Sequence, residues 1–353
     1  MKIKIIGSGS IGNHYANAYV NRNHDVSVFD ISSEALERMK NVIYPDRYEK
    51  WDDRINLLNT EDLIIKYDLV IIGTPPSSHI NEAIKCIKNS NANIVHIEKP
   101  ISLLNDPSLR EFNQLRKNSS IKIINGYNYN FSKPILKALD IISNNKLGSP
   151  IFINCNVREH WEGIFKAHPW IKNKEDSYLT HFNQGGGALL EHSHGVSYWQ
   201  YLSGVLNQGK IIKVNAFLNF VSTNKNRYDD ISTMFVKSES GIFGSITQDV
   251  ITKPYKKNIE IIFENGSIEI INNYKNNLDK VIYYNYNNNK SFEFEIPKKR
   301  IDDFLGLVNK TEEIYNGNNS EYELSIEFGL DVMKIIEFAV ISNQKKSEQN
   351  VVY

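Results

Sequence analysis

The chain has 353 residues, which is enough for two domains of ordinary size that each bury a core of their own. Lys and Arg together number 41, as do Asp and Glu, so no excess positive charge is available to hold a nucleic acid. Two distant cysteines, Cys86 and Cys155, indicate a reducing compartment and exclude a disulfide framework. No apolar run approaches the roughly 20 residues that cross a bilayer, and the N-terminus begins with a strand-like run and not with a signal peptide. We therefore expect a cytoplasmic protein without nucleic-acid or membrane partners.

The first 125 residues alternate between strand-like and helix-like segments. Short β-branched runs that predict strands lie at 3–6, 26–29, 68–72, 93–97 and 121–124. Helix-compatible segments lie between them, at 13–20, 78–88 and 106–117. Strands that alternate with helical spacers are typical of a parallel, doubly wound sheet. The sequence therefore predicts an α/β fold with an N-terminal Rossmann domain over residues 1–125.

From about Pro150 the pattern changes to consecutive strands. These are predicted at 151–157, 211–220, 232–236, 242–246, 258–263, 267–271, 280–284 and 292–296. Asn265-Gly266 is a strong signal for a two-residue hairpin, and residues 285–290 predict a hairpin loop. Two helices, at about 300–315 and 323–342, follow, and the second is a candidate to pack back on the first domain. Residues 126–353 are thus predicted to form an α+β domain with a large, open, mainly antiparallel sheet.

Gly7-Ser8-Gly9-Ser10-Ile11-Gly12 is a G-x-G-x-x-G motif between the first strand and the first helix. Gly7 permits the tight turn, Gly9 lets the backbone approach a pyrophosphate, and Gly12 allows close packing of helix on strand. The N–H groups of Ser10, Ile11 and the rest of the first helical turn suit phosphates. Asp30 closes the second strand, where an acid can accept hydrogen bonds from a ribose and repels a 2′-phosphate. The motif predicts NAD in preference to NADP; a glycine turn without a ligand is the alternative.

Two further segments follow predicted strands, at the carboxyl edge where such sheets bind ligands. They are Gly73-Thr74-Pro75-Pro76 and Glu98-Lys99-Pro100. Pro100 cannot continue a sheet ladder, so Lys99 is held at the end of its strand, where it could bond a substrate hydroxyl and carry its proton. From these residues alone, an ordinary turn and an exposed surface lysine remain alternatives.

These motifs recur in order together with His79, the run Gly185-Gly186-Gly187 and a histidine-bearing helix, and in this combination the chain resembles the Gfo/Idh/MocA oxidoreductases (glucose–fructose oxidoreductase, inositol dehydrogenase and relatives). The resemblance covers nearly the whole chain. It implies NAD(P)-dependent oxidation or reduction at a secondary carbon of a sugar, sugar phosphate or nucleotide-sugar, and allows a role in surface-polysaccharide precursor biosynthesis. It also implies a catalytic role for Lys99, and a place at the cofactor for Thr74, Pro75, His79 and Glu98.

The segment after the triple glycine predicts one helix over 188–202. Because no strand precedes the glycines, they are expected to permit close backbone packing and not to bind phosphate. Helical spacing places Leu189, Val196 and Trp199 on one face, with His192 beside them, and Glu191, His194, Tyr198 and Tyr201 on the opposite face.

The family carries an acid, a histidine four residues later and an aspartate three residues further on this helix. Here the acid is Glu191, the histidine is His194 at a spacing of three, and Ser197 stands where the aspartate would be. We expect His194 to act as catalytic acid/base with Glu191 beside it. His192 is predicted to point away from both, so no metal site is expected.

The segment between the first strand of the second domain and the triple glycine is rich in donors, cations and aromatic rings. Such side chains suit a sugar ring and an attached phosphate or carboxylate, whereas a solvated connecting loop is the alternative. The predicted substrate-binding residues are Arg158, His160, Trp161, Lys166, His168 and Tyr178. The family often carries an arginine soon after its sixth strand; Asn130 stands there, and no role is assigned to it.

In the expected mechanism, His194 takes the proton from a ring hydroxyl while Lys99 stabilises the negative charge that develops on the oxygen, and the hydride passes to nicotinamide. Two other activities fit the same resemblance: an NAD-dependent glycosidase that oxidises its substrate transiently, and a non-catalytic NAD-binding sensor. The open sheet predicts a homodimer or homotetramer, because an exposed sheet face commonly needs a partner.

Overall fold

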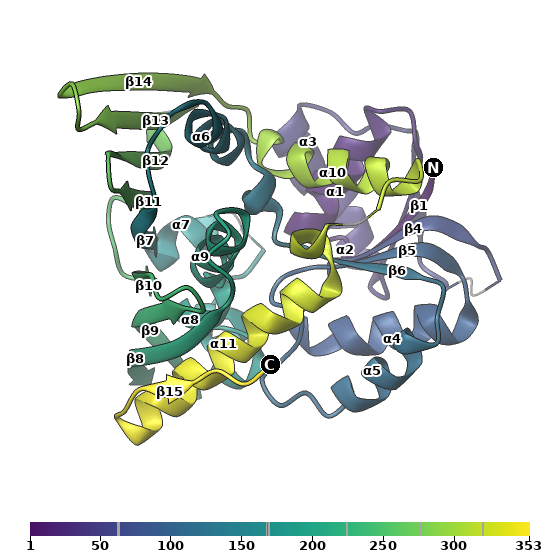
Figure 1. Ribbon diagram of the computed structural model, residues 1–353. Helices are drawn as coiled ribbons and strands as arrows, with labels where there is room; N and C mark the ends of the chain where they lie inside the picture. Colours follow the sequence, from purple (N-terminus) through teal and green to yellow (C-terminus); the bar gives the residue numbers. More distant parts are fainter. Residues whose placement is uncertain (62–63, 167, 169, 224, 276, 320) are drawn as a thin grey trace. The chain divides into compact units, whose positions relative to one another are not determined.

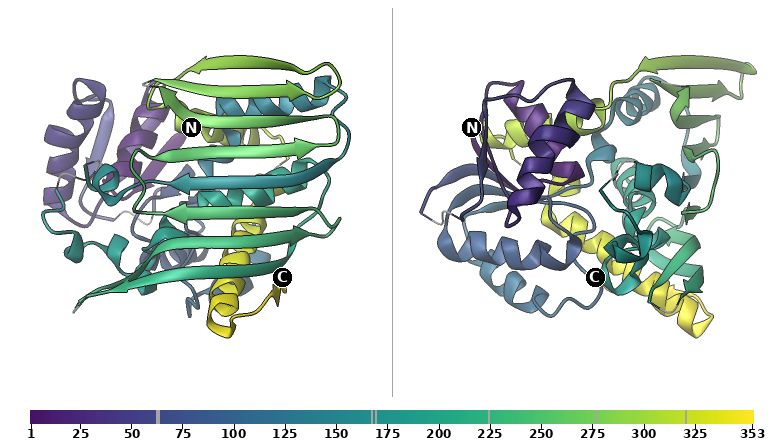
Figure 2. Two further views of the ribbon diagram at one scale, coloured as in Figure 1. Left: turned by 90° about the vertical axis from the view of Figure 1, so that its left-hand side faces the viewer. Right: turned by 180° about the vertical axis from the view of Figure 1, so that it is seen from behind.

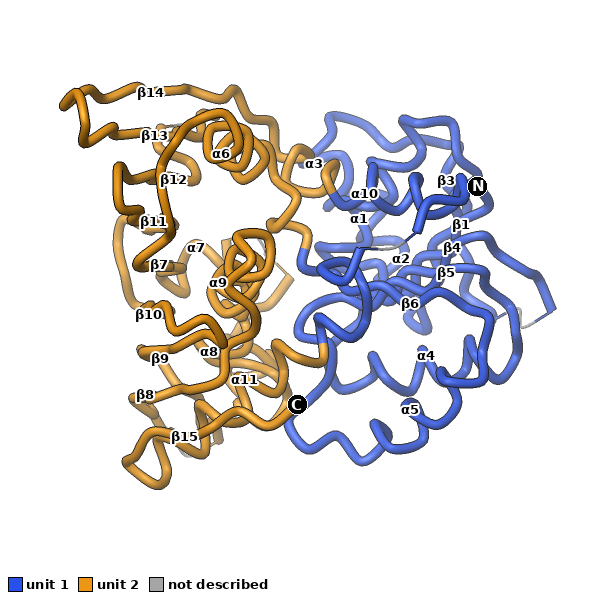
Figure 3. The backbone as a smooth tube through the Cα atoms, in the orientation of Figure 1, with its two compact units in different colours: residues 1–127, 307–329 blue, residues 128–306, 330–353 orange. Residues whose placement is uncertain are grey.

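The computed structural model of the protein describes residues 1–61, 64–166, 168, 170–223, 225–275, 277–319 and 321–353. The chain forms two compact units (Figure 3). Unit 1 contains residues 1–127 and 307–329, and unit 2 contains residues 128–306 and 330–353. The division predicted from the sequence, 1–125 and 126–353, differs because the chain returns to unit 1 for residues 307–329.

Unit 1 is built on a six-stranded parallel sheet (Figure 1). Its strands are β1 (Lys2–Ile6), β2 (Asp25–Phe29), β3 (Ile55–Leu58), β4 (Tyr67–Ile72), β5 (Ala92–Ile97) and β6 (Lys122–Asn125). The order β3-β2-β1-β4-β5-β6 is that of a Rossmann sheet, so the predicted architecture is confirmed. Strand β3 was not predicted, because of its four residues only Ile55 is fully buried and no apolar run marks it.

The helices of unit 1 begin with α1 (Ser10–Val20), α2 (Ser33–Arg38), a π-helical turn (Met39–Ile43) and α3 (Tyr44–Tyr48). They continue with a 3₁₀ turn (Pro76–Ser78), α4 (His79–Asn89), α5 (Leu109–Lys117) and a second 3₁₀ turn (Tyr322–Leu324). Helix α10 (Asp302–Tyr315) contributes its later residues to unit 1. There Glu312 accepts a hydrogen bond from Arg22, and its Oε1 lies 2.8 Å from Nε2 of His24. These contacts tie the late segment to the loop after α1.

Unit 2 contains a nine-stranded sheet in the order β14-β13-β12-β11-β7-β10-β9-β8-β15 (Figure 2, left). The strands are β7 (Pro150–Arg158), β8 (Ile211–Ser222), β9 (Arg227–Ser238), β10 (Phe243–Asp249), β11 (Lys256–Phe263), β12 (Gly266–Lys275), β13 (Leu278–Asn285), β14 (Lys290–Pro297) and β15 (Gln349–Asn350). Among the described residues of this sheet, only β7 and β10 pair in parallel. The open, mainly antiparallel sheet is confirmed. A hairpin does join β11 to β12, but its loop is Glu264-Asn265 and not the predicted Asn265-Gly266, because Gly266 pairs with Phe263 as the first residue of β12. The hairpin at 285–290 is confirmed. The two-residue strand β15 was not predicted.

Helices cover one face of this sheet. They are α6 (Lys133–Asn144), which contacts β12 and β13, α8 (Ala188–Glu191), which contacts β9 and β10, and α9 (His194–Val205), which contacts β7 and β10. Helix α7 (Trp161–Lys166), four 3₁₀ turns (Asn128–Phe131, Lys174–Asp176, Tyr178–Thr180, Phe182–Gln184) and most of α11 (Ile326–Lys345) complete the unit. Among the described residues, no helix has both the length and the hydropathy that a bilayer crossing requires.

The predicted single helix over 188–202 is wrong, because the chain turns between α8 and α9. At this turn the backbone bonds tighten, with Ser193 N donating to Leu190 O and Gly195 N to His192 O. His192 has φ −96° and ψ 24°, outside the α-helical range. The predicted division into a core face and a polar face fails as well, since His192, His194, Tyr198 and Tyr201 are all buried.

Candidate cofactor and substrate sites

The glycine-rich turn of unit 1 has the shape of a dinucleotide cradle. Gly7 has φ +105° and donates its N–H to Phe29 O at 2.8 Å, while a Cβ on Gly12 would come within 2.0 Å of Gly7 O. A Cβ on Gly9, in contrast, would meet no atom within 4 Å. Helix α1 starts at Ser10 without a side-chain cap and without an acid in its first turn. The turn therefore offers open space and helix-terminal N–H groups, including that of Ile11, which fit a pyrophosphate.

Asp30 braces this turn from the end of β2. Its Oδ2 accepts hydrogen bonds from the backbone N–H and the hydroxyl of Ser8, at 2.9 and 2.7 Å, and its Oδ1 accepts from Ser32 N at 3.0 Å. Each carboxylate oxygen has more than one acceptor position, so Asp30 can hold the turn and still accept from a ribose hydroxyl.

His79 connects the two loops at the carboxyl ends of β4 and β5. It is buried, with Nε2 2.8 Å from Thr74 O and Nδ1 2.9 Å from Pro100 O. Burial lowers the pKa of this imidazole, although the two carbonyls act in the opposite direction. Thr74 is half-buried and Pro75 exposed. The structure thus gives His79 a role in joining the loops that carry Pro75 and Lys99.

Glu98 lies beneath Lys99 in the interior of unit 1. Its Oε1 accepts a hydrogen bond from Tyr15 of α1 at 2.9 Å and is 3.1 Å from Nε2 of His96. Burial, together with the charge of Glu98, raises the pKa of Tyr15 well above its usual value. A Cβ on Gly126 would come within 2.7 Å of Glu98, so a glycine is needed there. Glu98 therefore links the cofactor-loop helix to the strand that carries the half-buried Lys99.

Unit 2 contains a polar cavity of about 220 Å³, and one of its walls is His194. The ring of Tyr129 lies 4.5 Å from the His194 ring, centroid to centroid, and stacks at 6.4 Å on Tyr198. Beside it, Asn130 donates from Nδ2 to the hydroxyl of Ser197 at 2.8 Å, and both are buried. The cavity is lined by Tyr129, Val157, Glu159, His194, Tyr198, Tyr255, Lys257, Asn272, Asn273, Lys298 and Arg300.

Three cations line this cavity. Lys257 bonds Glu159 at 2.7 Å, Lys298 bonds Asp303 at 2.7 Å, and Arg300 lies 3.8 Å from Asp303. Burial alone would lower the pKa of Lys257 and of Lys298, but their carboxylate partners outweigh it and raise both. In the same way, burial would raise the pKa of Glu159, yet Lys257 holds it below its usual value. Both ammonium groups are consequently charged at neutral pH.

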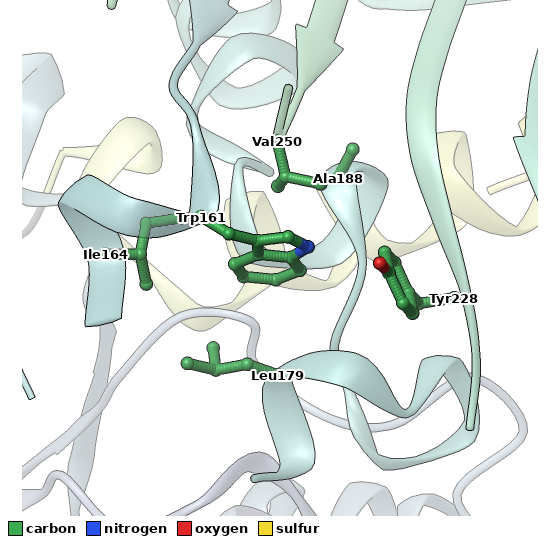
Figure 4. Packing of buried hydrophobic residues seen from close by; sticks show 6 residues of the cluster. All are labelled: Trp161, Ile164, Leu179, Ala188, Tyr228 and Val250. Carbon is green, nitrogen blue, oxygen red and sulfur yellow. The ribbon is translucent and has the colours of Figure 1, made fainter. Parts of the chain in front are cut away.

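The predicted substrate-binding residues do not line this cavity. Trp161 lies in a buried apolar cluster with Ile164, Leu179, Ala188, Tyr228 and Val250 (Figure 4). The partly buried Tyr178 packs against this cluster. Arg158 bonds Asp249 at 2.6 Å. His160 accepts from Glu162 N, His168 lies 2.7 Å from Ile164 O, and Lys166 is exposed. The neighbours Val157 and Glu159 line the cavity instead, because side chains alternate between the faces of β7.

Protein atoms occupy the space next to the triple glycine, where side chains would otherwise lie. A Cβ on Gly186 would come within 2.3 Å of the carbonyl oxygens of Tyr178 and Leu179, and one on Gly187 within 2.0 Å of Asp229 Oδ1. The run thus serves close packing, as expected. Glu191 is half-buried at the end of α8 and is not among the cavity-lining residues. Within the described part of the chain, no group of three His, Cys, Asp or Glu residues could hold a metal ion.

Comparison with known families places the chain. Residues 1–155 match the oxidoreductase family with an NAD-binding Rossmann fold, and residues 135–269 match the GFO/IDH/MocA C-terminal domain. The protein belongs to the Gfo/Idh/MocA family, and unit 1 contains its NAD-binding domain.

Solved structures share the fold over the whole chain. An NAD-binding oxidoreductase from Klebsiella pneumoniae is 19% identical with a TM-score of 0.79, covering 100% of this chain and 99% of that one. A levoglucosan dehydrogenase, in complex with NADH and levoglucosan, is 16% identical with a TM-score of 0.77, covering 100% and 99%. The WlbA dehydrogenase from Bordetella pertussis, in complex with NADH and UDP-GlcNAcA, is 14% identical with a TM-score of 0.73, covering 100% and 99%.

Proposed function

We propose that this oxidoreductase transfers a hydride between NAD and a secondary alcohol carbon of a sugar-type substrate. The observation that carries the proposal is the polar cavity of unit 2, which has His194 in its wall. Tyrosine rings and amide side chains, here Tyr129, Tyr198, Asn272 and Asn273, suit the faces and hydroxyls of a sugar ring. The bound sugars of levoglucosan dehydrogenase and of WlbA lend support from the same fold.

In this proposal His194 removes the proton from the substrate hydroxyl as its carbon loses a hydride. Lys99 donates a hydrogen bond to the same oxygen and stabilises its developing negative charge. The nicotinamide of bound NAD supplies the hydride acceptor. Asp30 favours NAD over NADP, because its carboxylate at the end of β2 would repel a 2′-phosphate. Glu191 is proposed to act beside His194 in catalysis. Glu98 and His79 hold the loops around Lys99.

The test is a comparison of Lys99→Ala and His194→Ala with two control variants, Lys88→Ala and His24→Ala, which change the same residue types outside the proposed site. Loss of a positioned proton-transfer group costs about 10²–10⁴-fold in rate, so turnover should fall by that order in the first pair only. NADH binding should stay close to wild type in all four. Turnover near wild type in Lys99→Ala and His194→Ala would refute the assignment.

Substrates are to be sought in a panel of sugars, sugar phosphates and nucleotide-sugars with NAD and with NADP, followed by absorbance of the reduced nicotinamide. Net NADH formation indicates a dehydrogenase. Release of free sugar without net NADH would indicate a glycosidase that oxidises transiently, and NAD binding without any Lys99-dependent turnover would indicate a sensor. Activity on a nucleotide-sugar would support a role in surface-polysaccharide precursor biosynthesis, in the cytoplasm.

We propose that the protein forms a homo-oligomer and that the uncovered face of the nine-stranded sheet is its interface. Phe217, Phe235 and Phe243, on β8, β9 and β10, are 64%, 58% and 58% exposed and share one face of the sheet by their register. This face is opposite the helices, because the next residue, Gly244, meets Trp199 of α9. Figure 2 (left) shows the face of the sheet that the helices leave uncovered. Exposed apolar patches on a sheet mark interfaces. A Phe235→Glu/Phe243→Glu variant should shift the mass measured by light scattering to that of the monomer, whereas Lys256→Glu should not. A wild-type monomer would refute this assembly.

A further inference from the structure

The proposed mechanism uses none of the cations of the unit 2 cavity in proton or hydride transfer. Its three cations come from two places in the sequence: Lys257 from β11, and Lys298 and Arg300 from the segment after β14. Against these three positive charges, one carboxylate lines the cavity, that of Glu159. The lining of the cavity therefore has more cationic donors than carboxylate acceptors, and the donor positions that are not used by protein carboxylates are available to an anionic ligand.

The carboxylates that pair with the Lys298 ammonium are not among the residues that line the cavity. Asp303 bonds the Lys298 ammonium at 2.7 Å and Asp279 lies at 3.5 Å, and the exposed fraction of each of these two side chains is 5%. Asp303 and Asp279 thus hold the Lys298 ammonium in place, and the same residue lines the cavity. Lys257 is held in the same way by Glu159, with 21% of its side chain exposed. Both cations are therefore preorganised without a ligand.

Arg300 differs from the two lysines. Its side chain is 57% exposed and lies 3.8 Å from Asp303, beyond hydrogen-bond distance. A guanidinium has five N–H donors in a planar fork that matches the two oxygens of a carboxylate or phosphate. The cavity thus contains two ammonium groups held by carboxylates, those of Lys257 and Lys298, and one guanidinium, that of Arg300, which can adjust to a ligand.

We infer that Lys257, Lys298 and Arg300 bind an anionic group, a carboxylate or a phosphate, attached to the sugar that the cavity takes. The inference rests on the proposed function and narrows its substrate to an acidic sugar. A cavity of about 220 Å³ lies below the roughly 300–1,000 Å³ of drug-sized sites, so it holds one substituted ring. The anionic group fixes the orientation of that ring, and its other hydroxyls meet Tyr129 and His194.

The experiment measures binding by calorimetry to the full-length protein saturated with NADH, using D-glucuronate, D-glucose 6-phosphate and D-glucose as probes. Arg300→Gln is the main variant, and Lys299→Gln is its control, because Lys299 is exposed and is not among the lining residues. A double variant, Glu159→Gln/Lys257→Gln, replaces a charged pair by a neutral hydrogen-bonding pair and leaves no buried charge alone. Lys256→Gln, at the exposed neighbouring position, is its control.

One of the acidic probes should bind more tightly than glucose. Loss of hydrogen bonds to a charged group corresponds to roughly 10- to 100-fold in affinity, so Arg300→Gln and the double variant should weaken acidic-probe binding by that factor. Glucose binding and the two controls should change less than about twofold. Preference for glucuronate identifies a carboxylate, and preference for glucose 6-phosphate identifies a phosphate.

Equal binding of acidic and neutral probes, an Arg300→Gln variant with wild-type affinity, or absence of acidic-probe binding would each overturn the inference. These outcomes are separate from the proposed function, which is judged by NADH formation. A neutral sugar that is oxidised with wild-type kcat/KM by Arg300→Gln would refute the anionic site and keep the dehydrogenase. Arg300-dependent binding of an acidic sugar without turnover would support the anionic site and count against the dehydrogenase.

Discussion

Two glycine-rich runs, one in each unit, solve opposite problems with the same residue. Around Gly9 a Cβ would meet open space, whereas around Gly186 and Gly187 it would meet backbone oxygens and the Asp229 carboxylate. The first run leaves room for a ligand at a helix N-terminus, and the second lets chain segments approach one another. The comparison teaches that a glycine run indicates missing side-chain volume, and that only its surroundings show what uses the space.

The largest effect should come from filling the second run. Gly187→Ala places a Cβ 2.0 Å from Asp229 Oδ1 at a φ of +89°, so strain and overpacking add. We expect the free energy of unfolding to fall by roughly 2–6 kcal/mol, measured by urea denaturation. Gly317→Ala is the matched control, with φ +101° but no atom within 4 Å, and should lose only the strain part. Equal losses in both variants would show that the Asp229 contact costs nothing.

Asp229 itself should give the stability a pH dependence. It is buried, it accepts a hydrogen bond from Leu189 N at 2.7 Å, and burial raises its pKa to about 7. Because the folded protein then binds the proton more tightly than the unfolded chain, this group stabilises the fold fully below pH ~4, and the contribution is lost as the pH rises to about 7. The slope should approach about 1.4 kcal/mol per pH unit.

Asp229→Asn tests this by removing the titration. Its stability, measured by urea denaturation at several pH values between about 4 and 7, should lack the wild-type decline that this group causes. Asp230→Asn, at the next position, serves as the control and should keep the decline. Identical pH profiles for wild type and Asp229→Asn would contradict the raised pKa.

The smallest effect on stability should come from the first run. Gly9→Ala should leave the free energy of unfolding within about 0.5 kcal/mol of wild type, since its Cβ meets no atom. NAD affinity should nevertheless fall by about tenfold or more, because the Cβ occupies the space where the backbone approaches a pyrophosphate. Gly12→Ala, with its 2.0 Å contact to Gly7 O, should instead lose stability. Unchanged NAD affinity in Gly9→Ala would contradict the assignment of the NAD pyrophosphate to this turn.

The sequence was sufficient for those parts of the fold that depend on local pattern. The Rossmann strands, the existence of a hairpin between β11 and β12 and the open sheet all have local signals, namely apolar runs and turn residues; the loop of that hairpin lies one residue earlier than predicted. Strand β3 lacks such a run. The break at His192–Ser193 separates α8, which packs on β9 and β10, from α9, which packs on β7 and β10, and periodicity along one helix does not report such tertiary packing.

The candidate site divides in the same way. The glycine turn, Asp30 and Lys99 belong to contiguous motifs, whereas the cavity cations Lys257, Lys298 and Arg300 are brought together by strands that are distant in sequence. One signal was present, however. Strand periodicity places Arg158 on the face opposite Val157 and Glu159, so the alternation in β7 was enough to separate a structural arginine from a cavity-lining glutamate.

Because of that alternation, the register of β7 determines which of its side chains face the cavity. Strand β7 pairs with a parallel neighbour, β10, on one side and with an antiparallel neighbour, β11, on the other, and both pairings fix this register. A slip of one residue would exchange the faces, turning the Arg158 guanidinium inward and the Glu159 carboxylate outward. Lys257 would then face a cation in place of its counter-ion. An insertion or deletion early in β7 would therefore add a fourth cation to the cavity wall and remove its carboxylate, without a substitution at any lining position.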